Sequence, residues 1–169
     1  MHRDFDTTGL AEDDLKFLDA PEHPGIAALA AYWEQKRGAR PLADRADIQP
    51  SEIVPLLPHI TICEVTNGGA DFRVRIFGTA LVELVGEERT GKFLSEFGKN
   101  CNPPTKASLV QGRWLEVHQR ACQSRGPVFA TGRMSSSARP YIVWHAVACP
   151  LTTGNHEITQ MLGAMMIAR

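Results

Sequence analysis

The sequence predicts an α+β domain: one sheet of five antiparallel strands, with helices packed on one face and a further helix before the first strand. Strand patterns occur in two groups, two before the helical middle of the chain and three after it. The first two are joined by Asn67-Gly68-Gly69, a strong hairpin turn. Strands grouped at both ends of a chain, with helices between them, are typical of an antiparallel sheet covered by helices.

The N-terminal part of the chain changes character near Pro24. Residues 1–22 are acidic and contain few apolar side chains, so we expect a partly disordered extension. A helix is predicted from Pro24 to Arg37, because apolar residues recur there at helical spacing and Gly38 follows. Its apolar stripe consists of Ile26, Leu29, Ala30 and Trp33.

Three segments follow from these patterns. Residues 1–22 are the extension, residues 23–57 are an N-terminal helical segment, and residues 58–169 are the main domain. The second segment is expected to contain a short helix between Pro50 and Pro58, because proline is well placed in a first helical turn. The main domain opens with a strand that carries Ile60 and leads into the hairpin turn.

The second strand of the hairpin has one apolar and one charged face. Phe72, Val74 and Ile76 alternate with Arg73 and Arg75, which is the period of a strand. We therefore expect the three apolar side chains to point into the core and the two arginines to point away from it.

Helical patterns follow this strand. Thr79 begins a short helix that Gly86 ends, and a Thr90-Gly91 turn precedes a second short helix at residues 93–97. The longest helical pattern then runs from Pro104 to Ser124. Three strand patterns complete the domain, at residues 128–134, 141–149 and 158–168.

Composition restricts the class of function. The chain has 169 residues and a formal net charge of -1, which gives no indication of a nucleic acid or an acidic membrane surface as partner. The four cysteines are far apart, and no long apolar run is present. We expect a cytoplasmic protein with reduced thiols.

The order of elements and several short motifs resemble a known family. A hairpin, short helices, one longer helix and three strands is the order in a PAS domain. The residues of the motifs are also similar to those of stand-alone bacterial PAS proteins, many of which are known only as domains of unknown function. The motifs are Tyr32-Trp33, Arg37-Gly38, Arg45 to Pro50, Arg73 to Thr79, and Thr90-Gly91.

The resemblance implies a sensory or protein-interaction module rather than an enzyme, without an output domain of its own. It would bind a small ligand or a signalling partner, and its ligand pocket would lie between the helices and the sheet. We expect the pocket to be lined by Ile76, Leu81, Leu84, Val85, Phe93, Leu94, Val110, Trp114, Val117, His118, Met134, Tyr141, Val143 and His145.

The last two strands are apolar on both faces, so a second cover is needed. We expect the helix at 24–37 to pack on the face opposite the pocket and to build part of a homodimer. The face that it would cover carries Ile142, Trp144, Met161, Met165 and Ile167.

Two features of the sequence resemble cofactor sites, one for flavin and one for haem, and neither is a strong indication. Gly98-Lys99-Asn100-Cys101 is similar to the Gly-x-Asn-Cys motif of flavin-binding photosensors, but the position equivalent to that motif is Gly91-Lys92-Phe93-Leu94, which has no cysteine. We therefore expect no flavin. His118 resembles, by its place on the long helix, the haem ligand of oxygen-sensing PAS domains, so haem stays a less favoured possibility. An edge-of-core histidine bonded to a backbone carbonyl is the commoner outcome.

Metal binding and catalysis have little support in the sequence. His118 and Cys122, one helical turn apart, could join His145 or Cys149, but no tight pair nucleates such a site and we expect no metal. His145 is either a polar group of the pocket or the partner in a core hydrogen bond. Two alternatives to the sensory module are a small isomerase or hydrolase that uses His145 or Asp71 as base, and an adaptor without a ligand.

Overall fold

The computed structural model describes residues 15–97, 107–134 and 142–168, without the side chains of 107–109. Three α-helices in this part are α2 (Pro24–Arg37), α3 (Thr79–Val85) and α4 (Ala107–Ser124). The strands are β1 (Lys16–Leu18), β2 (Ala43–Asp44), β3 (Ile60–Thr66), β4 (Asp71–Phe77), β5 (Val128–Arg133), β6 (Val143–Thr152) and β7 (Ile158–Ile167).

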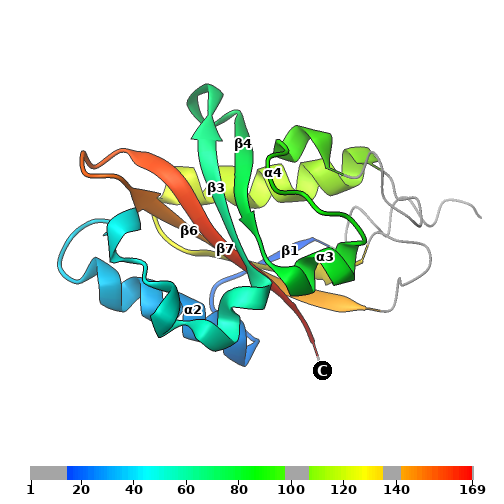
Figure 1. Ribbon diagram of the computed structural model, residues 1–169, viewed down its shortest axis with the longest axis horizontal. Coiled ribbons are helices and arrows are strands. Elements are labelled where there is room, and N and C mark those ends of the chain that lie inside the picture. Colours follow the sequence, from blue (N-terminus) through cyan, green and yellow to red (C-terminus); the bar gives the residue numbers. More distant parts are fainter. Residues whose placement is uncertain (1–14, 98–106, 135–141, 169) are drawn as a thin grey trace, which may run out of the picture.

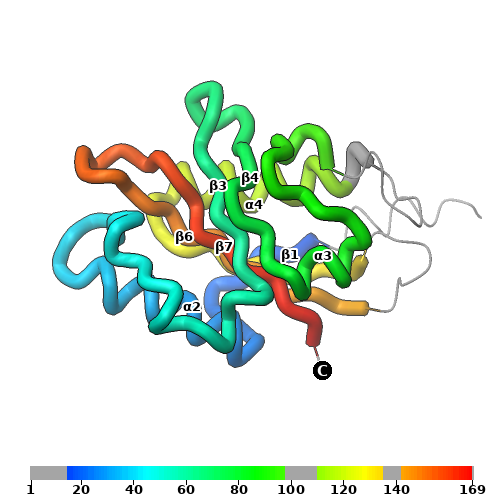
Figure 2. Tube along the Cα trace, viewed as in Figure 1, coloured from blue at the N-terminus to red at the C-terminus, as the bar shows by residue number. Residues whose placement is uncertain are grey.

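The described strands form one sheet in the order β1-β5-β6-β7-β3-β4, and β2 pairs with β6 beside this path. Neighbours along the path are antiparallel, whereas β2 is parallel to β6. The turns of the β3–β4 and β6–β7 hairpins point in different directions, as expected of a twisted sheet (Figure 2). The predicted α+β class, with an antiparallel sheet, is confirmed.

Two short strands were not predicted. Residues 16–18, assigned from sequence to the loose extension, form β1 and pair with Phe129–Thr131 of β5. Phe17 of this strand lies under the guanidinium of Arg120, 3.8 Å from the ring centroid. Three residues are too few to give a strand pattern. Residues 1–14 lie outside the described part of the chain.

The helix expected between Pro50 and Pro58 is instead two 3₁₀ helices, Pro50–Glu52 and Val54–His59. Prolines in this stretch remove backbone donors that an α-helix needs, which favours short, tight turns. The short helix expected at residues 93–97 is likewise a 3₁₀ turn, Leu94–Glu96, whose Glu96 carboxylate accepts a hydrogen bond from the Phe93 amide at 2.8 Å.

Helices cover both faces of the sheet, and Figure 1 shows the strands running between α2 and α4. We call the face under α3 and α4 the inner face and the face under α2 the outer face. The inner cluster is Cys63, Phe72, Val74, Phe77, Leu81, Leu94, Phe97, Val110, Val117, Ala121, Ala130, Trp144, Ala148, Met161 and Met165. The outer cluster is Ile26, Leu29, Tyr32, Trp33, Leu42, Ala43, Ile48, Ile53, Ile60, Ile62, Val147, Cys149, Leu151, Leu162, Ala164 and Met166.

The predicted docking of α2 on the second sheet face is confirmed. Ile26 and Trp33 are each only 1% exposed, and Leu29 is fully buried. The Trp33 indole donates a hydrogen bond to the Pro150 carbonyl, with a nitrogen–oxygen distance of 2.8 Å. The helix is therefore held by both apolar contact and a buried hydrogen bond to β6.

The two faces of β6 and β7 are exchanged relative to the prediction. Trp144 and Met165 belong to the inner cluster, whereas Val147 and Cys149 belong to the outer one. Alternate strand residues point to opposite faces, so one wrong assignment reverses the whole strand. The sequence pattern could not decide, because both faces are apolar.

Ile76 is exposed, contrary to prediction, because β4 contains a bulge. Ile62 pairs with Ile76 while the next residue, Cys63, pairs with Val74, so Arg75 is an extra residue. The bulge turns Ile76 outward, where it is 43% exposed, and places Phe77 in the inner cluster.

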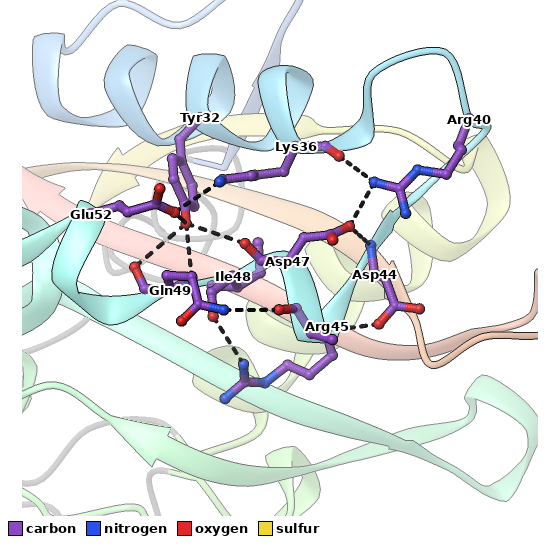
Figure 3. A network of polar contacts seen from close by, with 10 residues as sticks. Tyr32, Lys36, Arg40, Asp44, Arg45, Asp47, Ile48, Gln49 and Glu52 are labelled. Atoms are coloured by element: carbon purple, nitrogen blue, oxygen red, sulfur yellow. Dashed lines mark hydrogen bonds and ion pairs between the residues drawn. The ribbon is translucent and has the colours of Figure 1, made fainter.

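A polar network joins α2 to residues 44–52 (Figure 3). The Tyr32 hydroxyl donates to the Glu52 carboxylate at 2.8 Å and accepts from the Gln49 amide at 2.9 Å. Lys36 also pairs with Glu52, at 2.8 Å. Asp47 accepts from the Asp44 amide at 3.1 Å. The Arg45–Pro50 motif therefore orients a connector against α2.

The bulge can be tested with two neighbouring substitutions. Phe77→Ala should lower the free energy of unfolding by about 3–5 kcal/mol, because it empties a buried site. Ile76→Ala should change it by only about 0.5 kcal/mol, because the side chain is largely in water. Urea unfolding of both variants measures the difference. Equal losses would place Ile76 in the core and contradict the bulge.

Candidate ligand-binding interior

A row of rings runs through the space between the inner sheet face and α4. Phe77 and Trp114 both pack against Phe97, with centroid distances of 6.4 and 5.1 Å. Trp114 stacks on His118 at 6.1 Å, and His118 packs against Phe72 at 5.2 Å. Strand β4, the segment before α4 and α4 itself therefore supply one continuous aromatic interior.

Most of the predicted pocket residues lie in or beside this interior. Leu81, Leu94, Val110 and Val117 belong to the inner cluster, and His118 is buried beside it. Side chains that pack against the cluster while partly exposed are Leu84, Val85, Trp114 and Met134.

Other predicted pocket residues lie elsewhere. Ile76 and Val143 are exposed, at 43% and 37%. Phe93 lies under the guanidinium of Arg73, 5.8 Å from the ring centroid, and is only half-buried. His145 lies on the outer face beside His23. Tyr141 lies outside the described residues.

Buried charges in the interior were not foreseen from sequence. The Arg89 side chain is only 2% exposed, and its guanidinium lies 4.2 Å from the Phe97 ring centroid. Arg89 and Lys92 both pair with the carboxylate of Glu87, at 2.9 and 3.0 Å. Burial would raise the pKa of Glu87, but these two cations outweigh it and hold that pKa below its usual range.

Arg113 is a second buried cation, on the sheet side of α4. Its guanidinium donates a hydrogen bond to the Arg133 carbonyl at 2.7 Å and lies 5.9 Å from the Trp144 ring centroid. Neither Arg89 nor Arg113 belongs to a motif. A sequence pattern that assigns charged residues to the surface therefore misses both.

One ring nitrogen of His118 makes a hydrogen bond, and the other is buried in the core. Nδ1 contacts the Trp114 carbonyl at 2.8 Å, and a carbonyl only accepts, so Nδ1 carries the proton. Nε2 is then an acceptor, and it has no hydrogen-bond partner among the described residues. Burial lowers the pKa of His118 to about 4, so the ring is neutral at pH 7. The predicted bond to a backbone carbonyl is confirmed.

The proposed metal ligands lie on opposite faces of the sheet. His118 and Cys122 are on the inner side, whereas His145 and Cys149 are on the outer side. Within the described ranges, no three His, Cys, Asp or Glu side chains gather as a metal site. Burial raises the pKa of Cys63 to about 12 and also raises that of Cys149, so neither thiol is a ready nucleophile.

Acid should destabilise the fold through His118. Its folded pKa of about 4 lies below the ordinary 6.5, so unfolding takes up a proton as the pH falls through this window. The free energy of unfolding should fall by roughly 3 kcal/mol between pH 7 and pH 4 from this group alone. Urea unfolding should give a shallower pH dependence in His118→Met than in wild type. Identical slopes in His118→Met and wild type would show that His118 is not buried.

The chain is similar to known proteins in sequence and in fold. A receptor described as an RNA-binding light-oxygen-voltage receptor aligns at 13% sequence identity with a TM-score of 0.47; the alignment covers 90% of this chain and 38% of the receptor. The chain thus spans well under half the length of that receptor. A search of curated proteins gave no match. In the part that the structure describes, no helix is long and apolar enough to cross a membrane. A family model described as PAS domain matches residues 21–166, so the chain belongs to the PAS domain family.

Proposed function

We propose that this PAS domain is a sensory module that binds a small ligand between α4 and the inner sheet face. The observation that carries the proposal is the Nε2 atom of His118. A buried polar atom without a partner costs free energy, and sites that hold one are often completed by a ligand. The neighbouring rings of Phe72 and Trp114 supply the apolar surface that small-molecule sites use.

The chemistry around His118 limits the ligand. Because Nε2 is a neutral acceptor, the ligand would present an N–H or O–H group to it. The aromatic row would hold an apolar or aromatic body. Haem is the alternative occupant of the same nitrogen, since a neutral imidazole is also a metal ligand.

The structural change on ligand binding would be transmitted to the outer face through the sheet. Ala148 of β6 packs inward, while its two neighbours along the strand, Val147 and Cys149, pack under α2. A shift of β6 on the inner face therefore also moves the surface on which α2 lies. We propose that occupancy changes how α2 and the outer face contact a signalling partner.

The two candidate bases of the catalytic alternative lie away from this interior. His145 lies on the outer face. Both oxygens of Asp71 are engaged, with the Ser95 hydroxyl at 2.6 Å and the Phe72 amide at 2.9 Å. A base needs to reach a substrate proton, and neither group faces the inner cluster. The adaptor without ligand is separated from the sensory module by experiment.

Native mass spectrometry and absorption spectroscopy of the purified protein test the ligand. We expect a bound small molecule, with about tenfold lower occupancy in His118→Leu because one hydrogen bond is lost. His59→Gln, outside the interior, should bind as wild type. A Soret band would assign the site to haem. Only the mass of the bare chain, before and after incubation with small-molecule mixtures, would favour the adaptor.

We also propose a homodimer, with α2 as part of its interface. The apolar stripe of α2 is already buried against its own sheet, so the dimer interface would involve the opposite side of the helix. Exposed residues on that side are Ala28, Ala31 and Gln35. Small side chains there allow close approach of a second helix.

Sedimentation velocity should show a dimer for wild type and for Gln123→Arg on α4. Ala31→Arg should give monomers that keep the fold. A monomeric wild type at high concentration would contradict the proposal.

A further inference from the structure

His23 connects the first turn of α2 to the end of β7. It is the N-cap of α2, and its Nδ1 accepts a hydrogen bond from the Gly25 amide at 3.0 Å. Its Nε2 lies 3.1 Å from the carbonyl oxygen of Ile167. The ring therefore caps α2 through Nδ1 and joins the start of the helix to β7 through Nε2.

These two bonds require one protonation state. The Ile167 carbonyl only accepts, so Nε2 must carry a proton, and the Gly25 amide only donates, so Nδ1 must not. An imidazolium carries protons on both nitrogens and would set a donor against the Gly25 amide. It would also add positive charge at a helix N-terminus, where the dipole disfavours cations.

A second histidine lies beside this cap. The ring of His145 on β6 lies 5.8 Å from that of His23, and its Nδ1 is buried without a hydrogen-bond partner in the described ranges. Burial, and then the nearby His23, lower the pKa of His145, while Glu22 opposes them. The first turn of α2 adds no acidic or basic group, and β7 faces the rings with Met166 and the Ile167 carbonyl.

Packing under this turn is close. A Cβ added to Gly25 would collide with the end of the Met166 side chain, which would then have to move. Met166 is the cross-strand neighbour of His145. The helix start, the two rings and the two strands therefore form one contact.

We propose that His23 is a pH-sensitive latch: mild acidification protonates it, breaks the α2 cap and loosens the first turns of α2 from the outer sheet face. Histidine is the side chain whose charge ordinarily changes between pH 5 and 8. Protonation of Nδ1 removes the acceptor of the Gly25 amide, so docking is strongest above this range and weakens as the pH falls. The latch acts on the outer face and does not depend on a ligand in the interior.

Nuclear magnetic resonance of the full chain tests the hydrogen-bond pattern directly. At pH 7.5 the ring ¹⁵N shifts of His23 should report a protonated Nε2 and an unprotonated Nδ1. On acidification the Gly25 amide resonance should move with the same midpoint as the His23 ring. A different tautomer, or a Gly25 amide that does not follow the His23 titration, would overturn the proposal.

Hydrogen exchange of α2 tests the consequence. Corrected for the intrinsic rate, exchange within residues 26–33 should rise about fivefold more than exchange within α4 between pH 7.5 and 5.5, the effect of losing one cap. His23→Asn keeps a capping oxygen that cannot be protonated, so its α2 exchange should change with pH only as much as that of α4. His23→Ala should exchange fast at both pH values.

Two outcomes of that experiment would reject the latch. One is a wild-type α2 whose protection changes with pH no more than that of α4. The other is a response that persists in His23→Asn but is absent in His145→Asn, which would assign the titration to His145. If His23→Asn does not fold, the resonance titration of wild type decides the matter alone.

Discussion

The structure depends on one constraint: the central strands β6 and β7 are apolar on both faces, so the sheet cannot face water on either side. Helix α4 covers the inner face and α2 the outer one, and each brings its own apolar stripe. Without α2, a surface that includes Val147, Leu162 and Met166 would be exposed. The leading helix is therefore part of the domain core rather than an appendage.

This constraint also explains what the sequence could and could not predict. It was enough to require a second cover and to choose the helix carrying Ile26 and Trp33 for it. It could not say which face was which, because Trp144 and Val147 are equally suited to burial. The bulge at Arg75 was hidden for a related reason, since a single extra residue leaves the alternation on either side intact.

The candidate site was predictable in its apolar part only. Leu81, Leu94 and Val117 follow from helical spacing, because burial of an apolar stripe needs no knowledge of the partner. Arg89 and Glu87 could not be found this way, since their burial depends on each other and on the rings of residues distant in sequence. His118 was recognised as an edge-of-core histidine, yet which nitrogen faced the core required the position of the Trp114 carbonyl.

The two faces differ in how a signal could act on them. On the inner face the polar groups lie deep among aromatic rings, so a change there needs a molecule that enters, and His118 is too hard to protonate to respond to mild acid. On the outer face His23 is only half-buried and spans the edge of α2, where a proton can arrive from solvent. Both faces share β6 and β7. A ligand and a proton could therefore act on the same helix, α2, by different routes: one by moving the strands beneath it, the other by releasing its first turn.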